Sequence, residues 1–539
     1  MLEMNQQSGD WPSGGDRATV LAVVMLAVTL VGLTAQACVR ATDGVLVYAL
    51  DDAYIHLSLG RTLAESGILG VNARTPAAAS SSPAWTLLLA GATVPAGTAT
   101  WLPLALGTIS AGALAAIAER WLRDLRLAAR WRFAVIALML IVGPVGPLVM
   151  TGMEHVAHAA AVLLLVWLTL RETPVGPPGL ALAAALAMGL RYESAFVSAG
   201  LALVMILRHD RSRAVALVAG SAAVVIAVGL WQVSLGEGFL PNSLAVKAAG
   251  SFTANPASWL RWKAFGAMQD AFETPVTVLP LLAIIGAYAA ARGCGRSDGA
   301  DRRMRARIAA ESAAALTVAT VLHVSLARTG WYHRYEAYLI IWGIVAVAAS
   351  ASAWWSQREV CIGGGEGRPA MIAGVVAVTV LLLLSLGLRI NAHFTAPQAA
   401  GEIYRQHYQM ARFVEQYYDG EPLVMHDIGY VAYQTEGPLL DMGGLASHEV
   451  AIAKSEGRLN RALAERLARE HGAVIGISYE HDWVPDAWER IASWQIGSSR
   501  VVGSDTVHFF ALSEDPDRLR NRLREFEPSL PSGVAVVYR

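Results

Sequence analysis

Long apolar runs recur along this chain as far as residue 388, and several are long enough for a helix to cross a bilayer. A hydrocarbon core of about 30 Å requires roughly 20 mostly apolar residues per helix. The runs are residues 20–39, 101–117, 133–150, 156–170, 174–190, 195–207, 214–231, 275–291, 309–326, 338–355 and 371–388. Only 16% of all residues are charged, whereas a soluble protein carries about 25%. The sequence therefore predicts a polytopic α-helical membrane protein with about 11 transmembrane helices.

Arginines gather in three of the loops between these runs. The clusters are Arg120, Arg123, Arg126, Arg130 and Arg132; Arg208, Arg211 and Arg213; and Arg292, Arg296, Arg302, Arg303, Arg305 and Arg307. With a cytoplasmic N-terminus, alternate crossing places all three clusters on the cytoplasmic side, where basic loops are favoured. The opposite loops, around residues 51–100, 151–155, 232–272 and 329–335, are poor in Lys and Arg. Residues 84–90 are then expected to lie along the outer interface, because another span there would invert every later loop.

The last part of the chain has the composition of a water-facing domain. Residues 392–539 hold 21 of the 43 acidic residues and no apolar run long enough to span. Short apolar strands are predicted at 422–425, 439–440, 473–477 and 506–512, and residues 458–470 have helical periodicity. We therefore expect a transmembrane module over residues 1–391, with a first outer loop at 51–100, and an extracytoplasmic α/β domain over 392–539.

Charge and cysteine content exclude several classes of protein. The formal net charge is −1, so no long-range field favours a nucleic-acid partner. The three cysteines offer neither a metal-ligand spacing nor a disulfide framework. The partner that the composition does predict is the lipid bilayer.

Two adjacent carboxylates, Asp51 and Asp52, follow the first apolar run and open a predicted helix over residues 52–64. Carboxylates are favoured at this position because they meet the free backbone N–H groups and the positive end of the helix dipole. Capping explains one carboxylate, however. Two adjacent ones repel each other unless a metal ion or another cation lies nearby.

Further ionisable residues lie at the ends of apolar runs on the same side of the membrane. Glu154 occupies a very short loop, and Arg191 and Glu193 interrupt the stretch 174–207. A charge at such depth costs roughly 2.5–3.5 kcal/mol, so it usually pairs or lines a cavity. A structural ion pair between Arg191 and Glu193 is the plain explanation for the latter two residues.

Two more cations complete this outer group of residues. Lys247 follows Pro241-Asn242-Ser243, and Arg334 lies in Trp331-Tyr332-His333-Arg334-Tyr335, where an interfacial aromatic belt is the plain explanation. Carboxylates and cations together at a lipid–water boundary suit one chemistry. A base deprotonates an acceptor hydroxyl while cations stabilise a departing phosphate that is anchored to a lipid.

These motifs resemble the GT-C superfamily of membrane glycosyltransferases, most closely the mycobacterial-type terminal arabinofuranosyltransferases and their uncharacterised bacterial relatives. The likeness rests on Asp51-Asp52-Ala53-Tyr54-Ile55, Thr151-Gly152-Met153-Glu154, Arg191-Tyr192-Glu193-Ser194, Pro241-Asn242-Ser243 with Lys247, His426-Asp427-Ile428-Gly429 and Asp441-Met442-Gly443-Gly444-Leu445. It covers nearly the whole chain in order. The sequence departs from the family at Ser58, where arginine is usual, and at Tyr192, where proline is usual, which leaves the sugar donor open.

The resemblance implies an inverting transferase that moves a sugar, for example arabinofuranose, from a polyprenyl-phosphate donor to a cell-envelope glycan or glycolipid acceptor. Asp51 would be the base, and Asp52 and Glu154 would orient the acceptor or share a divalent metal (Mg, Mn or Ca). Arg191, Lys247 and Arg334 would bind the donor phosphate. Tyr54, Glu193, Asn242, Tyr332 and His333 would contact substrate. The protein would lie in the bacterial cytoplasmic (inner) membrane, with the C-terminal domain able to bind the growing glycan.

Two other functions stay open at this point. A non-catalytic membrane protein that binds glycan or scaffolds envelope assembly would share the fold without needing the carboxylates for chemistry. A transporter of lipid-linked sugars would be expected to show polar residues near mid-span and internal symmetry. The charges instead gather at one face and no repeat is found, so the transporter is the less favoured alternative.

Overall fold

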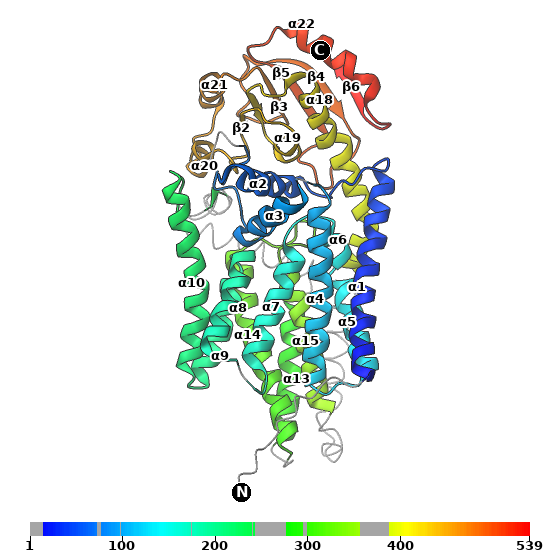
Figure 1. Cartoon of the computed structure of the whole chain (residues 1–539), viewed down its shortest axis with the longest axis vertical. Helices are drawn as coiled ribbons and strands as arrows, with labels where there is room; N and C mark the ends of the chain where they lie inside the picture. Colours follow the sequence, from blue (N-terminus) through cyan, green and yellow to red (C-terminus); the bar gives the residue numbers. More distant parts are fainter. Residues whose placement is uncertain are drawn as a thin grey trace.

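The computed structural model describes residues 14–72, 77–97, 99–173, 175–239, 241–242, 276–294, 299–355 and 387–539. Lys247 and nearly all of the predicted span 371–388 lie outside these residues. The described part forms a bundle of roughly parallel helices with an α/β domain at one end (Figure 1). The protein is therefore a multi-pass helical membrane protein with a C-terminal sheet domain, as the sequence predicts.

The bundle helices agree closely with the predicted runs. They are α1 (Gly14–Ala41), α4 (Leu102–Asp124), α5 (Ala129–Val142), α6 (Val145–Val149), α7 (His155–Leu170), α8 (Pro177–Leu190), α9 (Ser194–Leu207), α10 (Arg211–Ser234), α13 (Val278–Cys294), α14 (Ala300–Leu326) and α15 (Ala337–Trp355). Among the described residues, 5 helices are long and apolar enough to cross a membrane: α1, α4, α10, α14 and α15.

Several of the other predicted spans are shorter than a bilayer crossing. Helices α8 and α9 have 14 residues each, which gives a length of about 21 Å at 1.5 Å per residue. The run 133–150 is divided into α5 and α6 at Gly143-Pro144, because proline lacks the N–H that would continue the helix. The sequence pattern thus located these helices, although α8 and α9 are shorter than the roughly 20 residues that a straight crossing requires.

The described members of the three arginine clusters lie at the end of the bundle that faces away from the sheet domain (Figure 1). Helix α4 starts beside Tyr48, near the domain, where Leu104 N–H donates to the tyrosine hydroxyl at 2.9 Å, and it ends in the first cluster. Arg126 joins that cluster to Asp301 at the start of α14 at 2.9 Å. The predicted separation of basic loops from the candidate site is therefore present in the fold, while its orientation in the membrane stays a prediction.

Two helices lie across the end of the bundle, beneath the sheet domain (Figure 1). Helix α2 (Asp52–Ser66) begins at Asp52 as predicted and ends at Gly67, whose φ of 72° suits glycine. Helix α3 (Pro83–Ala96) includes residues 84–90 and exposes Leu87, Leu88 and Val94. It lies across the bundle end and does not run along the bundle as a further span, while its place at a membrane interface stays a prediction.

The C-terminal domain is built on one mixed sheet with the strand order β2-β1-β3-β5-β4-β6. The strands are β1 (Leu423–Met425), β2 (Leu439–Asp441), β3 (Ile475–Ser478), β4 (Glu489–Gln495), β5 (Thr506–Ala511) and β6 (Ala535–Tyr538). Strand β1 pairs in parallel with β2 and β3, and the remaining pairs are antiparallel. Strands β1, β2, β3 and β5 match predicted strands, whereas β4 and β6 were not predicted.

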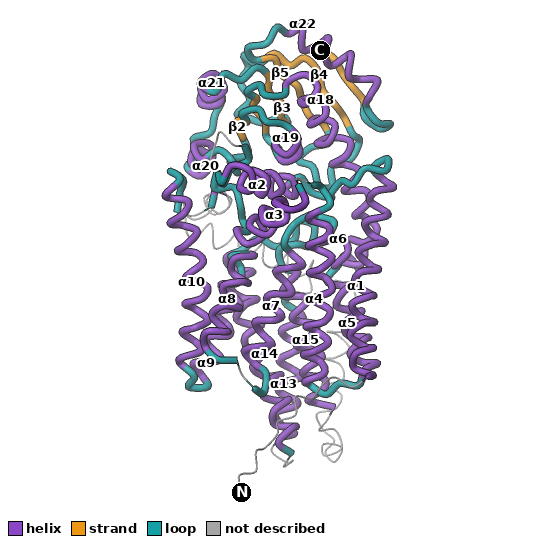
Figure 2. The backbone as a smooth tube through the Cα atoms, viewed as in Figure 1, coloured by secondary structure: helices purple, strands orange, loops and turns teal. Residues whose placement is uncertain are grey.

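Helices surround this sheet and connect it to the bundle (Figure 2). They are α18 (Gln409–Tyr418), α19 (Gly429–Gln434), α20 (His448–Ser455), α21 (Arg461–Glu470) and α22 (Pro516–Phe526). A continuous helical segment over residues 387–418 includes α18 and a π-helical turn at Tyr404–Tyr408. It runs through the expected domain boundary at residue 391, so the two parts are joined by a helix.

A buried ion pair ties this connecting helix to the loop before α15. Arg389 and Glu336 are both fully buried and lie 2.8 Å apart. The other guanidinium donors of Arg389 reach the carbonyl oxygens of Val142 at 2.9 Å and His333 at 3.0 Å. One side chain therefore joins the connecting helix, α5 and the loop that carries Arg334.

We expect Glu336→Gln to lower the free energy of unfolding by about 3–5 kcal/mol, because it leaves the buried Arg389 charge uncompensated. Thermal unfolding in detergent measures this effect. The matched control is Glu456→Gln, which breaks an exposed pair with Arg458 and is expected to cost about 1 kcal/mol or less. Equal stability of the two variants would contradict the structural role of the buried pair.

Candidate functional site

The carboxylate of Asp51 holds the start of α19, a helix that lies 378 residues later in the chain. Its Oδ2 accepts from the backbone N–H of Gly429 at 2.7 Å, and its Oδ1 accepts from Tyr430 N–H at 2.9 Å. The first N–H groups of a helix have no partner within the helix, so an external carboxylate stabilises them. A Cβ at position 429 would meet the Asp51 carbonyl oxygen at 2.2 Å, which explains the glycine there.

The other end of α19 is held by the same helix, α2. Arg61 donates to the carbonyl oxygens of Tyr433 at 2.9 Å and Ala432 at 3.2 Å. The Ser58 hydroxyl lies 2.7 Å from the same Ala432 oxygen. Serine at position 58 therefore belongs to the contact between the transmembrane module and the C-terminal domain. We call this set of contacts, made by Asp51, Ser58 and Arg61 with α19, the α2–α19 clamp.

A cavity of about 260 Å³ lies beside the clamp, between the bundle end and the C-terminal domain. Acidic and imidazole side chains make up much of its polar lining, with Trp331 and a few aliphatic residues around them. The ionisable residues of the lining are Asp51, Asp52, His407, His426, Asp427 and Asp441. The cavity is thus rich in groups that accept or exchange protons.

The environment of Asp51 raises its pKa to about 6. Burial is the largest cause, and the charge of Asp427 acts in the same direction, whereas His407 and the two N–H groups of α19 act against it. A carboxylate with this pKa is mostly ionised at neutral pH and is a stronger base than an ordinary aspartate. Such a value is suited to general base catalysis.

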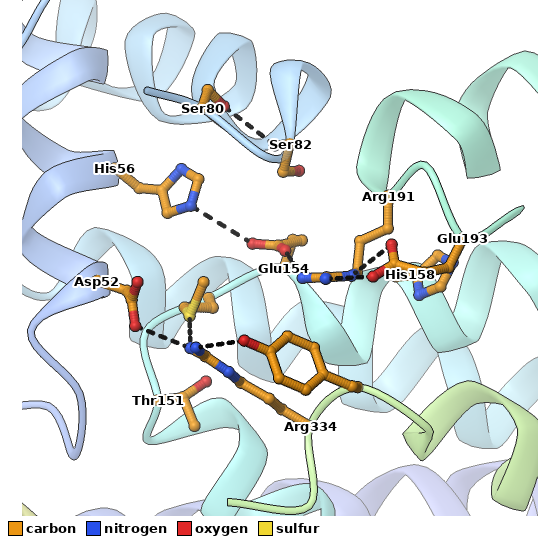
Figure 3. Close-up of polar contacts among 12 residues, drawn as sticks. Asp52, His56, Ser80, Ser82, Thr151, Glu154, His158, Arg191, Glu193 and Arg334 are labelled. Atoms are coloured by element: carbon orange, nitrogen blue, oxygen red, sulfur yellow. Dashed lines mark hydrogen bonds and ion pairs between the residues drawn. The ribbon is translucent and has the colours of Figure 1, made fainter. Parts of the chain in front are cut away.

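A network of ion pairs lies next to this cavity (Figure 3). Arg334 donates to Asp52 at 3.0 Å. Arg191 bonds to Glu154 at 2.7 Å and to both oxygens of Glu193 at 2.7 and 3.1 Å. The predicted pairing of Arg191 with Glu193 is therefore present, and Glu154 joins it. Three carboxylates face two guanidinium groups in this network.

The two arginines border a second, smaller cavity of about 130 Å³. Its lining includes Ser81, Tyr335, Arg191 and Arg334, and it shares Asp52, Ile55 and Leu445 with the larger cavity. Asp52 therefore lies in the wall between a cavity with proton-accepting groups and a cavity with guanidinium groups. This juxtaposition is the main chemical feature of the site.

The residues proposed to share a divalent metal do not suit one. Asp52 is paired with Arg334, and the fully buried Glu154 is paired with Arg191 and lies 3.9 Å from His56. In the part of the chain that the structure describes, no group of three or more His, Cys, Asp or Glu side chains is arranged to hold a metal ion. Guanidinium groups therefore occupy the positions beside Asp52 and Glu154 that a cation would take.

A left-handed turn carries Trp331 and leads into Arg334. Gly330, Trp331, Tyr332 and His333 have φ values of 74, 39, 62 and 60°, a conformation that costs about 1–3 kcal/mol for each non-glycine residue. Glu336 holds the turn by accepting from Gly330 N–H at 3.0 Å. Strained turns of this kind cluster at functional sites.

The remaining predicted substrate contacts lie at different places. Tyr54 packs on Tyr430 with ring centroids 3.8 Å apart and accepts from Tyr48 N–H, so it belongs to the interface between α2 and α19. Asn242 bonds to Leu445 O at 3.3 Å and to His448 at 2.9 Å, beneath α20. Tyr54, Asn242, Tyr332 and His333 are not among the residues that line the two cavities.

Sequence reasoning missed His407. In the sequence Asp427 belongs to the motif His426-Asp427-Ile428-Gly429, whereas His407 lies in a polar stretch with no pattern to distinguish it. The structure brings both residues into the cavity that contains Asp51. The proximity of His407 and Asp427 to Asp51 follows only from the docking of the two domains.

Comparison with known proteins gives one family model and distant structural similarity. Residues 401–510 match a domain of unknown function, DUF8728. No curated protein matches the chain. Among solved structures, the chain is similar to ArnT from Cupriavidus metallidurans bound to undecaprenyl phosphate, with 9% sequence identity and a TM-score of 0.49. That match covers 92% of this chain and 98% of the other.

We expect Arg61→Ala to loosen the docking of α19, because it removes a charged donor from two carbonyl oxygens at the end of that helix. Hydrogen bonds to charged groups contribute about 1.5–3 kcal/mol, so amide exchange at residues 429–434 is expected to accelerate by about 10- to 100-fold. Hydrogen–deuterium exchange with mass spectrometry measures this rate. Arg458→Ala, at an exposed residue of the same domain, serves as control. Unchanged protection of α19 would show that the clamp does not hold it.

Proposed function

We propose that the protein is an inverting glycosyltransferase of the GT-C type that transfers a sugar from a polyprenyl-phosphate donor to a cell-envelope glycan or glycolipid acceptor. The observation that carries the proposal is the position of Asp52 in the wall between two cavities. One cavity offers a raised-pKa carboxylate for an acceptor hydroxyl. The other offers guanidinium groups for a phosphate. The motif resemblance to GT-C enzymes supports the same assignment.

In this proposal Asp51 takes the proton from the acceptor hydroxyl. The acceptor oxygen forms a bond to the anomeric carbon while the bond from that carbon to the phosphate oxygen breaks. Polyprenyl phosphate leaves with the electron pair, and the anomeric configuration is inverted in the single displacement. Cationic groups beside the departing oxygen stabilise the charge that develops on it.

The two arginines are not equivalent in this role. The guanidinium of Arg191 is already bonded to two carboxylates, whereas Arg334 has one carboxylate partner together with Met153 Sδ and the Tyr335 hydroxyl. Arg334 also follows the strained turn at the cavity edge. We therefore assign the phosphate contact to Arg334 and a mainly structural role to Arg191, with Lys247 as a further candidate.

The proposal is tested by incubating purified protein with a panel of polyprenyl-phosphate sugars and an envelope glycan, and by measuring released polyprenyl phosphate. We expect release with at least one donor, at a rate that falls as the pH is lowered through about 6, because Asp51 must be ionised to act. Asp51→Asn is expected to lower the rate by about 10²–10⁴-fold. Failure with every donor, beside an active control enzyme, would reject the proposal.

A specific observation favours a non-catalytic alternative. Asp51 also docks α19, so a scaffold protein would need this residue for structure alone. Arg61→Ala separates the two roles, because it weakens the same docking without changing the cavity lining. If Asp51 is catalytic, Arg61→Ala is expected to lower the transfer rate by less than tenfold, and Asp51→Asn is expected to lower it far more. Equal losses would support the scaffold.

We expect Arg334→Gln to lower transfer by about 10²-fold or more while the protein stays folded, because a phosphate-stabilising charge is lost. Arg191→Gln should instead destabilise the fold by about 3–5 kcal/mol, since it leaves Glu154 buried without its cation. Transfer rates and thermal unfolding in detergent are measured for both, with Arg211→Gln at the opposite end of the bundle as control. Full activity of folded Arg334→Gln would refute its assignment.

A further inference from the structure

The C-terminal domain contributes a buried histidine to the larger cavity. His407 is 1% exposed, and its Nε2 lies 3.3 Å from Asp427 Oδ2. Asp427 is itself held by His426 Nδ1 at 3.2 Å and by the Tyr479 hydroxyl at 2.7 Å. The imidazole therefore has a fixed orientation, set by a carboxylate whose own position is fixed.

The backbone around His407 departs from a regular α-helix. The residue lies in the π-helical turn Tyr404–Tyr408, within the continuous helical segment 387–418. A π-helical turn inserts an extra residue into one turn and is frequent at functional sites. Gln406, the neighbouring residue in this turn, is buried and donates to the carbonyl oxygen of Ser504 at 2.9 Å. Both side chains therefore point into the C-terminal domain.

The second ring nitrogen of His407 has no hydrogen-bond partner among the described residues. Nδ1 is buried, although the residue lines the cavity that contains Asp51 and Asp52. A buried polar atom without a partner is destabilising, and such an atom in a native fold usually serves water, a ligand or a catalytic role. His407 thus combines one nitrogen held by Asp427 with a second nitrogen that has no hydrogen bond to the described residues.

The charges around the cavity favour a positive His407. Burial acts against the protonated ring, but the carboxylates of Asp51 and Asp427 raise the pKa of His407 above its ordinary value. Burial likewise raises the pKa of Asp51 to about 6, and protonated His407 is the largest influence in the opposite direction. Each group therefore stabilises the charged form of the other.

We propose that His407, which lines the same cavity as Asp51 from the side of the C-terminal domain, is a positioning residue that keeps this carboxylate ionised. The proposal deepens the proposed function and rests on Asp51 as its base. The domain that closes the cavity would thereby set the pH range in which a base on the transmembrane module works. Several titratable groups surround Asp51: Asp52 from α2, Tyr430 from α19, His407 from the π-helical turn, and His426, Asp427 and Tyr479 from the ends of the strands. Arg334 adds a positive charge, which is paired with Asp52.

His407→Gln tests the proposal, because glutamine can still donate to Asp427 but carries no charge. Protonation of Asp51 is followed by its carboxylic-acid infrared band, which is assigned by its loss in Asp51→Asn. We expect the midpoint of this band to move to higher pH by about one unit, since a nearby positive charge is removed. The acidic limb of the pH profile of the transfer rate should move to higher pH by the same amount. His508→Gln, at a histidine bonded to Ser493 between β4 and β5, should leave both unchanged.

A second measurement does not depend on the folding of the His407 variant. The imidazole of His407 is titrated by NMR in wild type and in Asp51→Asn, where the reciprocal effect predicts a lower midpoint in the variant. An unmoved Asp51 midpoint in folded His407→Gln, or equal His407 titrations in the two proteins, would overturn the inference.

The infrared and NMR titrations need no sugar donor. Absence of transfer with every donor would reject the proposed function, whereas unmoved midpoints with active wild type would reject only the role of His407.

Discussion

The carboxylate of Asp51 accepts the first two backbone N–H groups of α19, and the rest of the site depends on this contact. Helix α19 has six residues, too few to be stable alone because nucleation of a helix is unfavourable. Its free N–H and C=O groups find their partners on α2, through Asp51 at one end and Arg61 at the other. Without that docking, the cavity between bundle and sheet domain would have only one of its walls. The site is therefore a product of domain association, and neither part contains it alone.

The clamp also resolves why two adjacent carboxylates are tolerated at the start of α2. Successive residues of a helix are about 100° apart around its axis, so neighbouring side chains point in different directions. Asp51 turns toward the backbone of α19, and Asp52 turns toward Arg334. Each carboxylate thus has its own positive partner, a helix N-terminus for one and a guanidinium for the other. The repulsion expected from their sequence is therefore relieved by groups from two different domains.

Hydrophobic periodicity predicted most of the fold because burial in lipid or in a core leaves a regular pattern. Helix α2, the interfacial α3 and strands β1, β2, β3 and β5 follow from such patterns. Strands β4 and β6 were missed for different reasons: β4 buries four consecutive residues that include Ser493, and β6 has no fully buried residue. Ionisable residues at the ends of apolar runs predicted the pair of Arg191 with Glu193, whereas the pair of Arg334 with Asp52 was not predicted. His407 and the role of Ser58 were beyond reach, because both depend on contacts across more than one domain.

The pH behaviour of Asp51 bears on whether the clamp is only structural. A residue kept for stability is expected to have a lowered pKa, since its ionised form is then better bound in the folded state. Asp51 shows the opposite, a pKa raised from its ordinary value to about 6. Between those values the folded state binds more protons than the unfolded state, so the contribution of Asp51 to stability falls as the pH rises through this window. At neutral pH the ionised carboxylate is therefore buried at a cost in solvation free energy, and a pKa shifted in this way marks Asp51 as a candidate for acid–base chemistry. A carboxylate has about four lone-pair sites, and the two N–H groups of α19 occupy only part of them. In the proposed reaction the same residue therefore docks α19 and accepts a proton, through different lone pairs of one carboxylate.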